Sequence, residues 1–258
     1  MASEPQPTGV YRDTVWWNIG FSAYWFATSY KWFILLFVIL PREAERIGGA
    51  QFKNTTWGTI LGTGAVLAVI LPPIFARMTE TLGGQWSKRQ NWIAAGVALT
   101  VIGCLVLMMS NTIWMLAVGF YLLQIGDQAG TASYAGMVAD TVPAERRDFA
   151  SGILGALKPA GQIASIVAAG VLQSFGFPVI IGAVAAVNVV CGLWTLWAIK
   201  GLPAIKPHHV NRGNLAHDWI EPFQSHDFRF VWLNRFVVAL ASAIIFSYSL
   251  NYLTDMFP

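Results

Sequence analysis

Residues 152–173, GILGALKPAGQIASIVAAGVLQ, and residues 178–199, PVIIGAVAAVNVVCGLWTLWAI, decide the fold class of this 258-residue chain. A helix needs roughly 20 mostly apolar residues to cross a hydrocarbon core of about 30 Å, and each run has that length. Lys158 is the one charged residue in the two runs, and only residues 174–177 separate them. The stretch therefore predicts two antiparallel transmembrane helices joined by a tight turn.

The composition extends this interpretation to the whole chain. Charged residues make up 11% of the sequence, against about 25% in a typical soluble domain. The hydrophobic fraction is 55%, and the mean hydropathy is +0.54. The 12 Trp and 16 Phe residues also fit a membrane protein, because aromatic side chains gather where a bilayer meets water. So few charges could not cover a soluble protein of this size, and the sequence predicts an integral membrane protein.

Apolar runs of membrane-spanning length recur along the chain. The expected spans are residues 14–40, 55–76, 91–109, 112–139, 152–173 and 178–199, and a seventh begins near 230 and ends near 253. Very short linkers alternate with charged ones, which indicates a compact antiparallel helix bundle. The sequence therefore predicts an all-α, polytopic membrane protein.

The order of spans and linkers also predicts how the chain is organised. Residues 1–199 are expected to form a six-helix transmembrane half, 200–229 a linker, and 230–258 helix seven. Three spans, three more, and then a long linker fit a 3+3 inverted repeat of the kind that builds half of a transporter. The second half is expected to be absent or truncated in this chain.

Basic residues near the span ends predict the orientation, because cytoplasmic loops carry an excess of Lys and Arg. One side carries Arg12, Arg77, Lys88, Arg89, Arg146, Arg147, Lys200, Lys206, Arg212 and Arg229. The other side carries Arg42, Arg46 and Lys53. The N-terminus and the long linker are therefore expected in the cytoplasm. The expected location is the plasma membrane or a bacterial inner membrane, crossed several times.

Several function classes are excluded by what the sequence lacks. It contains no P-loop, G-x-S-x-G, H-E-x-x-H or C-x-x-C motif, so no enzyme, cofactor or metal site is expected. Cys104 and Cys191 lie within apolar runs, and His208, His209 and His217 stand in a polar linker without ligand spacing. The net charge of +3 is small and scattered, which argues against nucleic-acid binding.

Ionisable residues within the spans are the leading functional candidates, because each is costly unless it is paired or faces water. These are Asp127, Lys31 and Lys158, whereas Arg235 lies close enough to a span start to reach the interface. Counted at about 1.5 Å per residue from the cytoplasmic span ends, Asp127 lies about 19 Å deep and Lys158 about 10 Å. Asp127 with Lys158 is therefore the preferred pair, with Lys31 approaching from farther along the axis. Such a pair could serve substrate or proton binding, or it could only orient the helices.

Further polar and aromatic residues accompany these charges. Gln124 and Gln128 flank Asp127 at helical spacing, so part of that helix face is polar and should point into the bundle. Tyr134 lies on the same span as Asp127 and is a further substrate or coupling candidate, and Trp25 on the first span adds an aromatic group that could stack against a sugar. The alternative for these rings is a role in packing or in interfacial belts.

Glycines at helical spacing predict close helix contacts, as is common between transmembrane helices. They occur in the second and fifth spans, at Gly58, Gly62, Gly64, Gly152, Gly155 and Gly161.

Residues 139–152, ADTVPAERRDFASG, carry a resemblance to a known family, together with Gly126, Asp127, Ser133 and Tyr134 upstream. The stretch resembles the A-D-x-V-P-x-E-x-R-G-x-A-S-G loop of the major facilitator superfamily, especially its sugar-transporter-like and glycoside–cation symporter-like branches. The resemblance implies that Asp140, Glu145, Arg146 and Arg147 belong to a gating loop. It also implies that the first and fourth spans line a substrate cavity.

The loop between the second and third spans is similar to the family's G-x-x-x-D-R-x-G-R-R latch. Glu80 stands for the Asp, Ser87 for the second Gly, and Lys88 with Arg89 for the basic pair, although Thr81 replaces the family's first Arg. Residues 226–230 together with Arg235 resemble the entry into helix seven. These additional gating candidates are Glu80, Lys88 and Arg89.

Two functions remain open at this point. The first is a secondary active transporter that moves a small polar solute, with a sugar or glycoside as the candidate class, by alternating access. The second is a shortened relative that does not transport and instead acts as a structural or assembly subunit of a larger membrane protein complex. The expected partners are membrane lipid, the solute and, for the second function, the complex that covers the open half.

Overall fold

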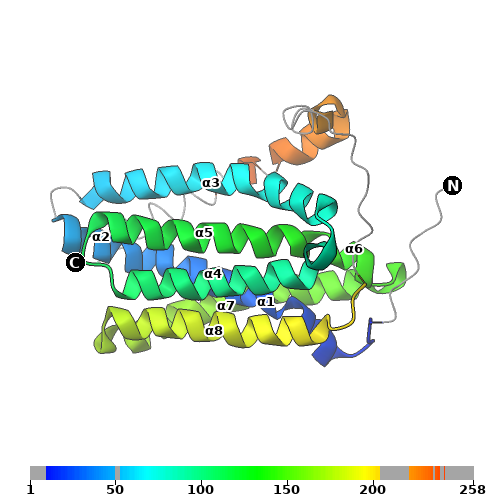
Figure 1. The fold of residues 1–258 in the computed structure, drawn as a ribbon, viewed down its shortest axis with the longest axis horizontal. Coiled ribbons are helices and arrows are strands. Elements are labelled where there is room, and N and C mark those ends of the chain that lie inside the picture. Colours follow the sequence, from blue (N-terminus) through cyan, green and yellow to red (C-terminus); the bar gives the residue numbers. More distant parts are fainter. Residues whose placement is uncertain (1–9, 50–52, 204–220, 235, 239–240, 242–258) are drawn as a thin grey trace. The chain divides into compact units, whose positions relative to one another are not determined.

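The computed structural model describes residues 10–49, 53–203, 221–234, 236–238 and 241 (Figure 1). No strand occurs among these residues, so the all-α class is confirmed for them. The chain divides into two compact units, Met1–His208 and His209–Pro258.

The first unit contains six long helices, each close to a predicted span (Figure 1). They are α1 (Val15–Ile34), α3 (Lys53–Thr81), α4 (Arg89–Met108), α5 (Ile113–Ala135), α7 (Arg147–Leu172) and α8 (Phe177–Ala198). A π-helical turn (Leu35–Ile39) and α2 (Leu40–Gly48) continue α1, and α6 (Met137–Thr141) follows α5. Short 3-10 turns lie at Gly84–Ser87, Ala144–Arg146 and Gln173–Phe175. Several observed helices extend beyond the predicted spans, because their first or last turns are polar and the spans were predicted from apolar residues alone.

Among the described residues, five helical stretches are long and apolar enough to cross a membrane. They are Val15–Gly48, Thr55–Thr81, Arg89–Met108, Ala144–Phe175 and Phe177–Ala198. Helix α5 is not among them, although the sequence predicted a span there. Its 23 residues are long enough, but Gln124, Asp127 and Gln128 lower its mean hydropathy.

The six long helices form two triplets along the chain, α1, α3, α4 and α5, α7, α8, and the first helix of each triplet packs against the other triplet. Helix α1 packs against α7 and α8, while α5 packs against α3 and α4, and α4 also contacts α8. The first helix of each triplet thus packs on the second and third helices of the other triplet. This reciprocal arrangement treats the two triplets alike, as an internal repeat does.

Helices α1 and α5 also begin in the same way. The Thr14 hydroxyl accepts a hydrogen bond from the backbone N–H of Trp17, at 3.2 Å, and Thr112 accepts one from Met115, at 3.3 Å. These hydroxyls satisfy backbone donors that the first helical turn leaves open. The sequence showed no alignment between the two triplets, whereas the structure reveals this shared N-cap.

Some of the predicted glycine contacts form. A side chain on Gly161 would overlap the Phe26 carbonyl, so α7 approaches α1 closely there. Gly64 likewise lies against the Phe120 ring, and Gly96 and Gly126 let α4 and α5 meet. At the remaining predicted glycines an added Cβ would have no neighbouring atom within 4 Å among the described residues; these are Gly58, Gly62, Gly152 and Gly155.

Two apolar clusters fill the bundle, one toward each end. One includes Ile34 of α1 with Phe120 of α5, and the other includes Phe21 of α1 with Tyr134 of α5. Both helices therefore pass from one cluster to the other. On α5, Asp127 lies between the two clusters, whereas Lys31 on α1 lies within the first cluster, between Tyr30 and Ile34.

The second unit is described in part. A 3-10 turn (Glu221–Gln224) precedes a helix over residues 226–234 and 236–238, which overlaps the start of the predicted seventh span. Arg235, His208, His209 and His217 lie outside the described residues.

Candidate functional site

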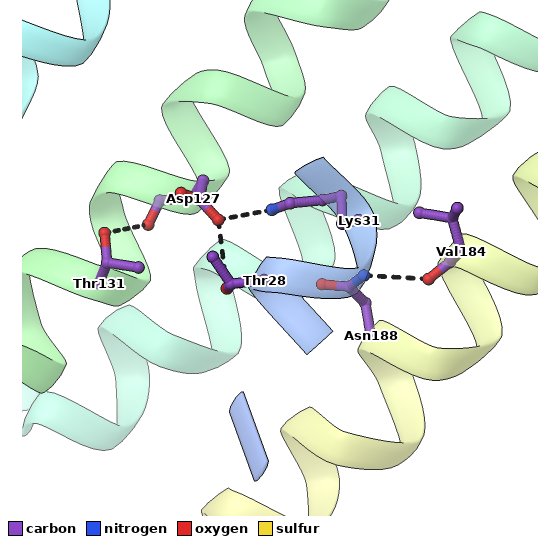
Figure 2. Close-up of polar contacts among 6 residues, drawn as sticks. All are labelled: Thr28, Lys31, Asp127, Thr131, Val184 and Asn188. Atoms are coloured by element: carbon purple, nitrogen blue, oxygen red, sulfur yellow. Dashed lines mark hydrogen bonds and ion pairs between the residues drawn. The ribbon is translucent and has the colours of Figure 1, made fainter. Parts of the chain in front are cut away.

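A buried ion pair joins α1 to α5 in the middle of the bundle (Figure 2). The Lys31 ammonium lies 2.6 Å from the Asp127 Oδ1 atom. The side chains are only 1% and 7% exposed. The pair therefore connects the first helices of the two triplets through two buried charges.

The preferred pairing of Asp127 with Lys158 is wrong, because Asp127 pairs with Lys31. Helical side chains lean toward the N-terminus of their helix. Helices α1 and α5 run in opposite directions, so Lys31 and Asp127 lean toward each other. Lys158 leans back toward the start of α7, where its ammonium lies 3.7 Å from the centre of the Trp25 ring. The sequence-based depths were counted along the helix axes alone, so they did not include the direction in which each side chain leans.

Two threonines hold the acidic partner in place (Figure 2). The Thr28 hydroxyl, one turn before Lys31 on α1, donates to Asp127 Oδ1 at 3.3 Å. The Thr131 hydroxyl donates to the Asp127 backbone carbonyl at 2.7 Å. The buried carboxylate is therefore met by both a cation and a hydroxyl from α1, as a buried charge requires.

A small open pocket of about 160 Å³ lies between α1, α3 and α5. One of its lining residues, Trp32, has its ring centre 5.1 Å from the Lys31 ammonium, so the pocket is next to the pair. The candidates Gln124 and Gln128 line the pocket together with Trp32, which the sequence analysis did not single out. The Gln124 amide also donates to the Gly64 carbonyl at 3.2 Å, which links α5 to α3. The pocket thus presents amides and an indole close to the buried charges.

Tyr134 and Trp25 belong to a different part of the bundle. Tyr134 is buried, and its hydroxyl donates to the Phe21 carbonyl at 2.8 Å, so in this structure it ties α5 to α1. The half-buried Trp25 packs edge-on against Tyr134 and carries the Lys158 ammonium on its face. These three candidates gather in one cluster that is separate from the Lys31–Asp127 pair.

Polar residues of α8 were missed by the sequence analysis. Asn188 is 1% exposed and donates to the Val184 carbonyl at 3.0 Å (Figure 2). The Thr195 hydroxyl donates to the Gly20 carbonyl at 2.9 Å and accepts the Tyr24 backbone N–H at 3.0 Å. A lone Asn and a lone Thr in an otherwise apolar run were the available signal.

The gating candidates lie at the end of the bundle where α1 begins. The Arg89 guanidinium donates to the Ser133 carbonyl at 2.9 Å and joins α4 to the end of α5. Arg146 pairs with Asp13 at 2.6 Å, and both side chains are about half exposed. These contacts place Arg89 and Arg146 at the same end of the bundle, whereas the side of the membrane that this end faces stays a prediction.

The remaining gating candidates behave differently from one another. Arg147 donates to the Val142 carbonyl at 3.2 Å, while Glu145 is exposed. Glu80 is also exposed, and within the described part of the chain no ion pair joins it to Lys88 or Arg89. The latch expected from Glu80 is therefore not formed in this structure. The side chain of Asp140, in α6, lies outside the described residues.

No metal-binding cluster forms among the described residues, since no three His, Cys, Asp or Glu side chains lie close enough to hold an ion. Cys104 and Cys191 are free thiols in separate helices.

Comparison with models of known protein families identifies the family of this chain. The family model described as Major Facilitator Superfamily matches residues 15–258. A search of curated proteins finds no match to the chain. The matched range begins with α1 and continues through all six long helices of the first unit into the second.

Proposed function

Because the chain belongs to the Major Facilitator Superfamily, we propose that it is a secondary active transporter that moves a small polar solute by alternating access. Membership of this family and its apolar helices make it a multi-pass membrane protein of the transporter type. The proposed solute class is a sugar or glycoside. The observation that carries the proposal is the buried Lys31–Asp127 pair between the first helices of the two triplets.

The ion pair offers a way to couple a proton to a movement of helices. Binding of one proton to the Asp127 carboxylate neutralises it and leaves the Lys31 ammonium buried without a counter-charge. An uncompensated charge inside a membrane protein costs several kcal/mol. Protonation therefore favours a rearrangement of α1 against α5 that brings Lys31 to water or to a polar solute.

The proposed solute position is the pocket beside the pair. Gln124 and Gln128 offer amide donors and acceptors to hydroxyl groups, and Trp32 offers an aromatic face for a sugar ring. Gln128 follows Asp127 directly on α5. A solute that binds Gln128 would therefore lie close to the carboxylate whose charge changes on proton binding.

The test is uptake of radiolabelled sugars by proteoliposomes that contain the whole chain, with and without an imposed proton gradient. Asp127→Asn is expected to abolish gradient-driven accumulation while the protein still inserts and stays helical. The matched control is Asp227→Asn, which makes the same chemical change at an exposed carboxylate outside the loops assigned to gating. The control should accumulate solute like the unmodified chain.

Two results would contradict the proposal. Unchanged accumulation in Asp127→Asn would remove Asp127 from the coupling mechanism. Absence of solute exchange across a broad panel of sugars and glycosides, by a folded and inserted chain, would reject the solute class.

The open faces of α3 and α7 favour a second candidate function, that of a structural subunit in a larger membrane complex. Gly58 and Gly62 of α3, and Gly152 and Gly155 of α7, have open space where a neighbouring helix could pack. Purification from native membranes in fixed stoichiometry with other proteins, without exchange activity, would support this second candidate. Concentrative uptake by the purified chain would exclude it as the main function.

A further inference from the structure

A second pocket, of about 370 Å³, lies at the end of the bundle where α1 begins and α8 ends. Its lining includes Arg12, Trp17, Trp197, Lys200 and Gly201. None of these residues takes part in the Lys31–Asp127 pair or in the pocket beside it. The proposed transport function leaves this second pocket without a role.

The pocket carries positive charge that the described protein does not neutralise. Within the described residues, neither Arg12 nor Lys200 forms an ion pair, and both are exposed. Asp13, the acidic residue next to Arg12, is held by Arg146 at 2.6 Å. An anion in the pocket would therefore meet two cations.

The end of α8 would ordinarily repel an anion, because helix C-termini carry partial negative charge. Here the last carbonyls are already engaged. The Trp17 indole donates to the Ala198 carbonyl at 2.9 Å, and the Gln90 amide donates to the Ile199 carbonyl. These hydrogen bonds reduce the repulsion at the place where the two cations stand.

An apolar stripe leads from the pocket along α8. Val190, Leu193 and Trp197 are 60–63% exposed, and their spacing of three and four residues places them on one helix face. Trp197 lies at the pocket end of this stripe, where an aromatic ring suits the boundary between acyl chains and headgroups. Lys200 follows one turn later. The basic pocket followed by the apolar stripe therefore matches a phospholipid, which has a charged headgroup followed by apolar acyl chains.

We propose that this pocket binds the headgroup of an anionic phospholipid. The phosphate group lies between Arg12 and Lys200, and an acyl chain follows Trp197, Leu193 and Val190 along α8. Basic pockets at membrane interfaces select anionic headgroups in this way. Zwitterionic phosphatidylcholine has the same phosphate but carries its own cation, which the two basic residues disfavour.

The test is native mass spectrometry of the whole chain released from nanodiscs that contain equal amounts of phosphatidylglycerol and phosphatidylcholine. The unmodified chain is expected to retain phosphatidylglycerol preferentially. Each pocket cation should contribute about fivefold to this preference, so Arg12→Gln with Lys200→Gln should lower it by up to about thirtyfold. The single variant Lys200→Gln should lower the preference for phosphatidylglycerol by about fivefold. This variant provides the test if the double variant does not insert.

The matched control is Arg42→Gln with Lys88→Gln, which removes the same charge from exposed positions outside the pocket. This control should keep the preference of the unmodified chain. An equal loss in both double variants would overturn the proposal in favour of diffuse surface attraction. Displacement of retained phosphatidylglycerol by inorganic phosphate alone would overturn the lipid assignment in favour of a free-anion site.

Discussion

Two ion pairs of the same length occupy opposite environments in this molecule. Lys31–Asp127 and Arg146–Asp13 both have a nitrogen–oxygen distance of 2.6 Å. The side chains of the first pair are 1% and 7% exposed, and those of the second are 52% and 48% exposed. The comparison teaches that the contact distance does not set the energetic weight of a pair; the surroundings do, because water screens one pair and is excluded from the other.

The same difference separates their proposed roles. A buried pair changes the free energy of the bundle strongly when it gains a proton or loses a partner, which suits a coupling element. An exposed pair between the segment before α1 and the turn before α7 is easily made and broken, which suits a contact that changes during gating.

The largest effect is expected from removing the basic partner of the buried pair. Lys31→Met leaves the Asp127 carboxylate buried without its cation, and the bundle should lose about 3–5 kcal/mol of stability. Unfolding by a denaturing detergent in mixed micelles, followed by helical circular dichroism, measures this loss. A loss below about 1 kcal/mol would mean that water or another cation compensates the Asp127 charge. The buried pair would then be no different in energy from the exposed one.

A smaller loss is expected when both charges are replaced together. Lys31→Met combined with Asp127→Leu removes the pair without leaving a lone charge, and such replacements are often close to neutral. The double variant should therefore be more stable than either single variant, with a coupling energy of about 2 kcal/mol or more. Additive losses in the double-mutant cycle would show that the two residues stabilise the bundle independently.

An effect smaller than this coupling energy is expected from the hydroxyl that supports the carboxylate. Thr28→Val keeps the shape of the side chain but removes the donor to Asp127, and it should cost about 1 kcal/mol in the same unfolding assay. Thr28→Ser keeps the donor and serves as the control. Equal losses in the two variants would assign the cost to packing instead of the hydrogen bond.

The smallest effect is expected at the exposed pair. Asp13→Asn should change stability by at most about 1 kcal/mol, and the change should vanish at about 1 M salt, where the screening length falls to about 3 Å. Asp148→Asn, at another exposed carboxylate, provides a reference for the loss of charge alone. A large, salt-independent loss at Asp13 would mean that the pair is shielded from water in the membrane-bound protein.

Much of the fold was predictable because membrane helices leave a strong pattern. The lengths of the apolar runs and the alternation of short and charged linkers predicted six helices close to those observed, and the charge count marked one basic end. The exact helix ends were less predictable, because polar first turns such as that of α7 form outside the apolar run. The packing of the first helix of each triplet against the other triplet could not be predicted from the sequence. The N-caps that the triplets share, Thr14 and Thr112, are single residues of a common type.

The candidate site was predictable in its members but not in its pairings. Lys31 and Asp127 were identified because any charge in an apolar span needs a partner. Asn188 and Thr195 were missed because a single polar residue in α8 can satisfy itself on a helix backbone, as Asn188 does on the Val184 carbonyl. For the candidate Tyr134 the structure shows a partner that the sequence did not predict, because its hydroxyl donates to the Phe21 carbonyl.

The sequence by itself determined that this protein lies in a membrane, how many long helices its first unit forms and which residues must find polar partners there. Hydropathy and helix length depend on local composition, so they can be read along the chain. The tertiary structure alone decided that Asp127 meets Lys31 and that Lys158 meets Trp25. That choice depends on the direction of each helix and on the lean of its side chains, and both are fixed only when the helices pack.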